Sequence, residues 1–178
     1  RAGEPRGGGG ARRGIYAPGS DNLFQGLRVA PMLGRTFGSD DTRDATNPVA
    51  ILSHRFWQEY FGGEAAAIGR SIQLHGVSHT IVGVLPASFE FASPDIELWT
   101  PLPRDPQLVP GNRGRHFANA VGRLKPDATF EQAQAEMDTI ASRLALEYPA
   151  TNDHWGVMVE PLQQSLVADS RAVLLILW

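Results

Sequence analysis

The chain has 178 residues, of which 42% are hydrophobic and 20% charged, a composition typical of one or two compact domains with a sizeable core. Its formal net charge of −3 provides no positive field to attract nucleic acid or an acidic membrane surface, so we predict no nucleic-acid partner. The lack of cysteine excludes disulfide bonds and thiolate chemistry.

The first residues differ in composition from the rest of the chain. RAGEPRGGGGARRG is rich in glycine and arginine and has no apolar periodicity, so residues 1–14 are predicted to be disordered or a remnant. The glycine run is not followed by the Gly-Lys-Ser/Thr of a phosphate-binding loop. No cofactor is therefore predicted.

The segment 38–44, GSDDTRD, contains three aspartates but lacks the glycine and the distal glutamate of a calcium loop. We interpret Ser39 as a helix cap that is followed by acidic residues in the first turn, where they complement the helix dipole. A metal site is not predicted here.

Ser53 and His54 are adjacent in ILSHRFWQEYFGG, which raises the question of a nucleophile with its base. PVAILS, residues 48–53, predicts a short strand, and the following residues predict a helix with one aromatic face made of Phe56, Trp57, Tyr60 and Phe61. Ser53 lies where a helix N-cap belongs, and Gly62 where a left-handed stop belongs. Because the Gly-x-Ser-x-Gly of a nucleophile elbow is absent, we predict a structural role for Ser53.

Residues 67–86 predict a β-hairpin. Ile72 and Leu74 alternate with polar residues, and a second β-rich run follows a two-residue turn at His75 and Gly76. His75 and His79 lie on either side of this turn without a third ligand, so we predict no metal site there either.

Residues 91–115 are rich in proline and glycine and predict a long surface excursion, a kind of loop that often carries function. In and beside this loop we name five candidate contact residues for a partner: Asn112, Arg113, Arg115, Phe89 and Phe91.

The last third predicts a β-α-β unit. HFANAVGRLKP, residues 116–126, predicts a strand, and WGVMVEPL, residues 155–162, predicts a second one. Between them, Thr129 and Gln132 form a capping box before an amphipathic helix from Phe130 to Glu147. Three residues of its apolar face are predicted to be buried against the strands: Met137, Ile140 and Leu144.

The order of these motifs strongly resembles the MacB-like periplasmic core domain of bacterial ABC-transporter permeases of the FtsX/MacB type, and within them the large duplicated permeases. The resemblance rests on NLFQGLRVAPMLGRTF, VAILSHRFWQEYFGG, IGRSIQLHGVSHTIVGVLPASF, ELWTPL and GRHFANAVGRLKPDATFEQAQAEMDTIASRLALEYP, and it covers residues 15–171. It implies a mixed α/β fold, with an inserted subdomain at about 22–102 that contains the hairpin, and a porter-like β-α-β half at 115–162. The first porter strand and helix of the family have no counterpart in residues 1–14.

The resemblance also implies a function. The chain would be the periplasmic domain of an inner-membrane permease for transport or efflux, with AVLLILW, residues 172–178, as the start of a transmembrane helix. The implied partners are a cytoplasmic ATP-binding subunit acting through the membrane helices, a periplasmic adaptor, and a second permease half or a second copy. The resemblance implies no catalytic residue. Two alternatives are a soluble serine hydrolase that uses Ser53 with His54 or His116, and a free-standing binding module.

Overall fold

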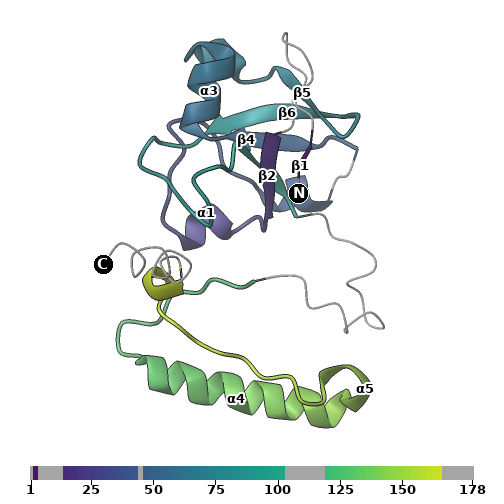
Figure 1. Cartoon of the computed structure of the whole chain (residues 1–178), viewed down its shortest axis with the longest axis vertical. Helices are drawn as coiled ribbons and strands as arrows, with labels where there is room; N and C mark the ends of the chain where they lie inside the picture. The colour runs from purple at the N-terminus through teal and green to yellow at the C-terminus, as the bar shows by residue number, and fades with distance from the viewer. Residues whose placement is uncertain (1, 4–13, 44–45, 103–118, 166–178) are drawn as a thin grey trace, which may run out of the picture. The chain divides into compact units, whose positions relative to one another are not determined.

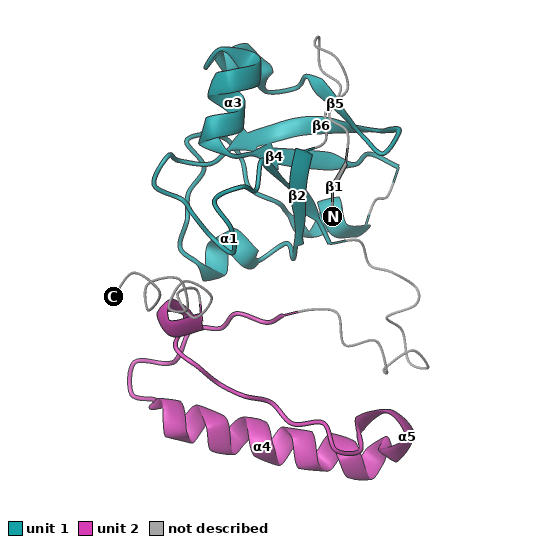
Figure 2. Cartoon of the chain, in the orientation of Figure 1, with its two compact units in different colours: residues 1–104 teal, residues 105–178 magenta. Residues whose placement is uncertain are grey.

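The computed structural model describes residues 2–3, 14–43, 46–102 and 119–165 (Figure 1). The chain divides into two compact units, residues 1–104 and residues 105–178 (Figure 2).

Unit 1 is built on a mixed β-sheet with the strand order β1-β2-β7-β4-β6-β3, in which β5 also pairs with β6. The strands are β1 Ala2–Gly3, β2 Gly14–Gly19, β3 Leu33–Gly34, β4 Val49–Leu52, β5 Ser71–Leu74, β6 Val77–Val84 and β7 Leu98–Pro101. β2 runs parallel to β7 and β4 runs parallel to β6, whereas β4 and β7 are antiparallel. The predicted mixed α/β fold is confirmed.

Both faces of the sheet are apolar, as the central strand β4 shows. Ala50 and Leu52 belong to one hydrophobic cluster, and Val49 and Ile51 belong to the other, because successive strand residues point to opposite faces. The first cluster includes the aromatic side chains of α3, His54–Phe61, and the second includes Phe24 of α1, Leu23–Gly26. In the described part of unit 1, the other helical segments are α2 Ser39–Arg43 and the 3-10 helix Ala65–Ala67.

The hairpin and the helix stop are formed as predicted. β5 and β6 pair in antiparallel register from Leu74↔Val77 to Ser71↔Thr80. His75 and Gly76 between them have φ angles of 51° and 80°, the left-handed conformations that a tight hairpin turn requires. Gly62 at the end of α3 has φ 60°, as expected for a left-handed stop.

The interpretation of Ser39 as a helix cap is wrong. Ser39 is the first residue of α2, and the side chain that caps this turn is Asp41, whose carboxylate accepts a hydrogen bond from the Gly38 amide at 2.7 Å. The same carboxylate pairs with the guanidinium of Arg35 at 2.6 and 2.9 Å. This ion pair lowers the pKa of Asp41. The predicted acidic first turn is confirmed, because Asp40 and Asp41 both lie in the first turn of α2.

The predicted surface excursion over residues 91–115 is also wrong in part. Residues 98–101 form β7, which lies inside the sheet between β2 and β4, and the residues from Ile96 to Thr100 are buried. Pro94 and Pro101 bracket the run, and proline is tolerated at strand ends. The proline-rich composition therefore marks the boundaries of a short interior strand.

Two further predictions concern the ends of the chain. Within residues 1–14, which were predicted to be disordered or a remnant, Ala2 and Gly3 pair antiparallel with Ile15 and Gly14. The predicted membrane segment 172–178 lies outside the described residues. Among the residues that the structure describes, no helix combines the length and hydropathy needed to cross a bilayer.

Unit 2 contains α4 Phe130–Glu147 and α5 Pro149–Asn152. The predicted capping box is present: the Gln132 amide donates to Thr129 Oγ1 at 3.2 Å, and the Thr129 amide donates to Gln132 Oε1 at 3.0 Å. The predicted helix is therefore confirmed at both ends.

The strands predicted on either side of α4 are not formed among residues 119–165. No strand partner lies beside the returning chain in this range. Instead, the Gln134 side chain donates to the Val157 carbonyl at 2.6 Å and accepts from the Val159 amide at 2.7 Å, so one amide replaces a strand partner. Without a sheet the apolar face is only partly covered, with Met137 and Leu144 half-buried and Ile140 37% exposed. The prediction that all three are buried is wrong.

The partly buried ring of His79 on β6 is expected to make the stability of unit 1 depend on pH. It lies opposite Ile72, and its Nδ1 donates to the Val77 carbonyl at 3.1 Å. Burial lowers the pKa of His79 below 6.5, and the bond to Val77 offsets this effect only in part. The unfolded chain therefore binds this proton more readily than the folded chain does, and stability is lost as the pH falls through 6.5 toward the lower folded pKa.

We expect the melting temperature to decrease between pH 7 and pH 5, and His79→Gln to make that decrease smaller. Asp41 contributes little in this window, because its lowered pKa places its loss of stability below 3.8. Thermal denaturation at the two pH values checks this. An equal decrease in the wild type and the variant would contradict it.

Candidate partner-binding site

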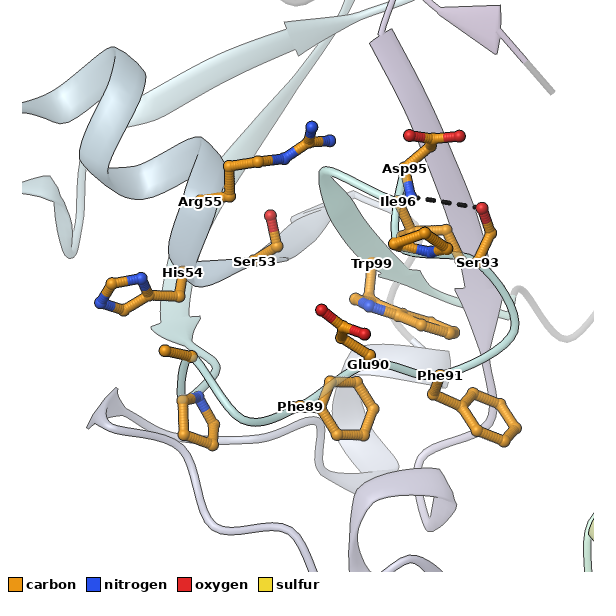
Figure 3. Close-up of a pocket in the computed structure, with 13 residues that line it drawn as sticks. Ser53, His54, Arg55, Phe89, Glu90, Phe91, Ser93, Asp95, Ile96 and Trp99 are labelled. Atoms are coloured by element: carbon orange, nitrogen blue, oxygen red, sulfur yellow. Dashed lines mark hydrogen bonds between the residues drawn. The ribbon is translucent and has the colours of Figure 1, made fainter. Parts of the chain in front are cut away.

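A pocket with a volume of about 180 Å³ lies in unit 1 beside the first turn of α3 (Figure 3). Ser53, His54 and Arg55 line it on the helix side, residues of the segment 86–96 line the opposite side, and Trp99 comes from β7. The pocket therefore forms where the loop between β6 and β7 passes the start of α3.

An aromatic cluster forms the apolar wall of the pocket. The rings of Phe89 and Phe91 lie 6.1 and 6.0 Å from that of Trp99. Phe24 of α1 lies behind them, 5.7 Å from Phe89 and 5.8 Å from Trp99, and it is fully buried. Such contacts between rings add to the free energy of burial, so this wall is anchored in the core.

Short-range hydrogen bonds fix the segment 86–96. The Phe89 amide donates to the Pro86 carbonyl at 3.0 Å, and the Ser93 amide donates to the Phe91 carbonyl at 2.8 Å. The Asp95 amide donates to Ser93 Oγ at 3.2 Å, which Figure 3 shows as a dashed line. These bonds give the pocket wall a defined backbone in the absence of regular secondary structure.

Ser53 and His54 both have structural roles at the pocket. Ser53 Oγ accepts a hydrogen bond from the Phe56 amide at 3.3 Å, which confirms the predicted N-cap. The His54 ring packs against Trp57 at 5.6 Å and is turned away from the Ser53 hydroxyl in Figure 3. Within the part of the chain that the structure describes, no hydrogen bond joins Ser53 Oγ to His54, so the geometry does not favour that pairing as a nucleophile and its base. His116, the other base named for the hydrolase alternative, lies outside the described residues.

Replacing Ser53 with alanine is expected to lower the free energy of unfolding by about 1 kcal/mol, because the Phe56 amide loses its cap. Ser53→Asn keeps a capping oxygen and should restore most of this loss. Urea denaturation measures both variants. Equal stability of Ser53→Ala and the wild type would show that the cap contributes nothing.

Three exposed charged side chains surround the opening of the pocket. Arg55 lies on the helix side, and Glu90 and Asp95 lie on the loop side (Figure 3). None of them forms an ion pair with another described residue. The rim therefore carries two carboxylates and one guanidinium that are available to a ligand.

The predicted contact residues have different outcomes. Phe89 and Phe91 lie together in the pocket wall. Asn112, Arg113 and Arg115 lie outside the described residues. Arg55 and Trp99 also line the pocket and were not predicted. For Glu90, the alternation of aromatic and acidic residues in SFEF, residues 88–91, was a local signal for a mixed surface. Over the described ranges, no group of three or more histidine, aspartate and glutamate side chains is arranged to hold a metal ion.

The model of the MacB-like periplasmic core domain family matches residues 2–140. The chain belongs to this family. As a MacB-like domain, it is a periplasmic domain of an ABC-transporter permease and lies outside the cytoplasm. The comparison with curated proteins finds no match.

Two solved structures with TM-scores above 0.5 show the same fold at low sequence identity. The periplasmic region of MacB from Actinobacillus actinomycetemcomitans is 15% identical with a TM-score of 0.55, over 85% of this MacB-like chain and 65% of that one. A domain of a permease protein from Porphyromonas gingivalis is 14% identical with a TM-score of 0.52, over 80% and 65%. The extracellular domain of the transporter YknZ from Gram-positive bacteria is 17% identical with a TM-score of 0.45, over 57% and 50%. The MacB-like chain thus spans less than two thirds of each structure.

Proposed function

We propose that this domain relays ATP-driven motion from the membrane part of its permease to the periplasmic side and contacts a partner protein there. The observation that carries the proposal is the family match over residues 2–140, which spans both compact units. Relative displacement of two compact units is a common way to transmit a conformational change.

The partners follow from the same proposal. A cytoplasmic ATP-binding subunit would drive the permease through its membrane helices, and the domain would work beside a second permease half or a second copy. A periplasmic adaptor is the kind of protein that would contact the pocket wall at Phe89 and Phe91. The proposal places residues 172–178 at the start of a membrane helix, which anchors the domain to the inner membrane. It equates residues 22–102 with the inserted subdomain and residues 115–162 with the porter-like half.

Spin labels in the intact transporter test the relay. The chain contains no cysteine, so introduced cysteines can be labelled selectively within it. We would place one label at the exposed Glu59 on α3 and one at the exposed Ser142 on α4. If unit 1 and unit 2 move with the ATP cycle, the distance distribution between the labels should shift by several Å between the nucleotide-free and the ATP-bound transporter.

A label pair within unit 1, at Glu59 and Ser78, is the matched control, because both positions are exposed and belong to one compact unit. Its distance distribution should stay the same in both states. Identical distributions for the Glu59 and Ser142 pair with and without ATP would overturn the relay.

A further inference from the structure

The size of the pocket beside α3 limits what can enter it. Its volume is about 180 Å³, whereas pockets for drug-sized molecules usually enclose about 300 to 1,000 Å³. A cavity of about 150 Å³ can hold one benzene ring. The pocket is therefore too small for a large transported molecule and has the size of a single aromatic side chain.

The wall of the pocket fits such a side chain. Phe89 and Phe91 are each half-buried, so part of each ring remains open to solvent, while Trp99 behind them is only 4% exposed. An incoming ring would extend a cluster that already contains these rings and Phe24. Burial of one aromatic anchor in a pocket is the arrangement that dominates the energetics of many protein interfaces.

The charges at the rim of the pocket favour a ligand that carries a positive charge next to its aromatic anchor. Glu90 and Asp95 provide two carboxylates against the single guanidinium of Arg55, and all three side chains are exposed. In Figure 3, Arg55 and Asp95 lie on opposite sides of the pocket, and Glu90 lies below them beside Phe89. A cation next to an aromatic anchor would meet the carboxylates and the ring faces, whereas an anion would be repelled.

We infer that this pocket is a docking site for a segment of a partner protein that inserts one aromatic side chain and carries a lysine or arginine next to it. The inference rests on the proposed function, because it names the chemistry of the partner at the same site. The segment contributes the anchor, which packs inside the pocket against the wall formed by Phe89, Phe91 and Trp99, and its cation lies at the rim beside Glu90 or Asp95. Both interactions are non-covalent.

Nuclear magnetic resonance titration of the ¹⁵N-labelled full chain tests the inference, with acetyl-Phe-Arg-amide and acetyl-Phe-Glu-amide as probes. We expect acetyl-Phe-Arg-amide to shift the amide signals of residues 53–55 and 89–96. It should bind about fivefold more tightly than acetyl-Phe-Glu-amide, the upper end of the range for one favourable exposed charge pair. Acetyl-Ala-Arg-amide, which lacks the anchor, should produce no shifts at these residues.

Matched double variants separate the rim from the overall charge. Glu90→Gln/Asp95→Asn should remove the preference for the arginine probe. Glu59→Gln/Glu64→Gln removes the same charge from exposed positions outside the pocket and should keep the preference. All four positions are exposed, so an unchanged spectrum of the free protein confirms the fold of each variant.

Three results would overturn the inference: no shifts with acetyl-Phe-Arg-amide, shifts confined to other residues, or equal binding of the two charged probes. Equal binding of 2-phenylethylamine, which has no peptide backbone, would also overturn it, because the site would then take a small amine. The label distances in the intact transporter do not depend on these titrations. A failure of the docking site is therefore distinguishable from a failure of the relay.

Discussion

Phe24→Ala is expected to lower the free energy of unfolding by about 3 to 5 kcal/mol, the range for truncating a large buried aromatic side chain. Phe24 has no exposed surface, although α1 contains only four residues. Its ring lies within 5.6 to 5.8 Å of the rings of Phe37, Phe89 and Trp99, so its loss leaves a cavity bordered by three aromatic side chains.

Urea denaturation followed by tryptophan fluorescence measures this effect, because Trp57 and Trp99 are buried in unit 1. Met32→Ala is the control, since Met32 is a large apolar side chain of the same unit that is 44% exposed. It should change the free energy of unfolding by no more than about 0.5 kcal/mol. Similar losses in both variants would show that Phe24 does not anchor the cluster.

Gly83→Ala is expected to destabilise unit 1 by about 3 kcal/mol, the upper part of the range for overpacking. Gly83 on β6 pairs with Gly34 on β3. A Cβ atom at Gly83 would overlap the backbone carbonyl oxygen of Arg35, and a backbone atom cannot move aside as a flexible side chain can. The Arg35 amide is itself held by the Val82 carbonyl at 2.8 Å, so relief of the overlap would separate β3 from β6.

Gly26→Ala is the matched control for this substitution. No atom lies within 4 Å of a Cβ placed at Gly26, and the residue is helical, so alanine should leave the stability unchanged or raise it by less than about 1 kcal/mol. The midpoint of urea denaturation compares the two variants directly. A Gly83→Ala midpoint equal to that of the wild type would mean that β3 adapts without cost.

Local signals predicted the elements whose information lies within a few residues. The cap at Ser53, the turn at His75 and the capping box at Thr129 each depend on neighbouring residues alone, and each is formed. β7 was not predicted, because its four residues become part of the sheet interior only when they pair with β2 and β4. Both of these strands lie far from β7 in the sequence. The strands predicted beside α4 were wrong for the same reason, since alternation of residue types does not provide a partner strand.

The candidate site was predictable only in part. Phe89 and Phe91 stood out as apolar residues close to a proline-rich stretch, and both line the pocket. Arg55 joins them because the loop between β6 and β7 passes the start of α3, and no local pattern encodes that approach. Trp99 falls within the predicted surface loop, whereas in the structure its ring contacts those of Phe24 and Phe89.

The position of β7 has a consequence for synthesis of the protein. β7 is the last strand of unit 1 along the chain, yet it lies between β2 and β4 and bonds to both. Until residues 98–101 have left the ribosome, β2 and β4 each present one unpaired edge, and such edges pair readily with other chains. A nascent chain that stalls before Leu98 therefore exposes two unpaired strand edges that are prone to aggregation. Addition of the four residues of β7 allows both edges to form their hydrogen bonds.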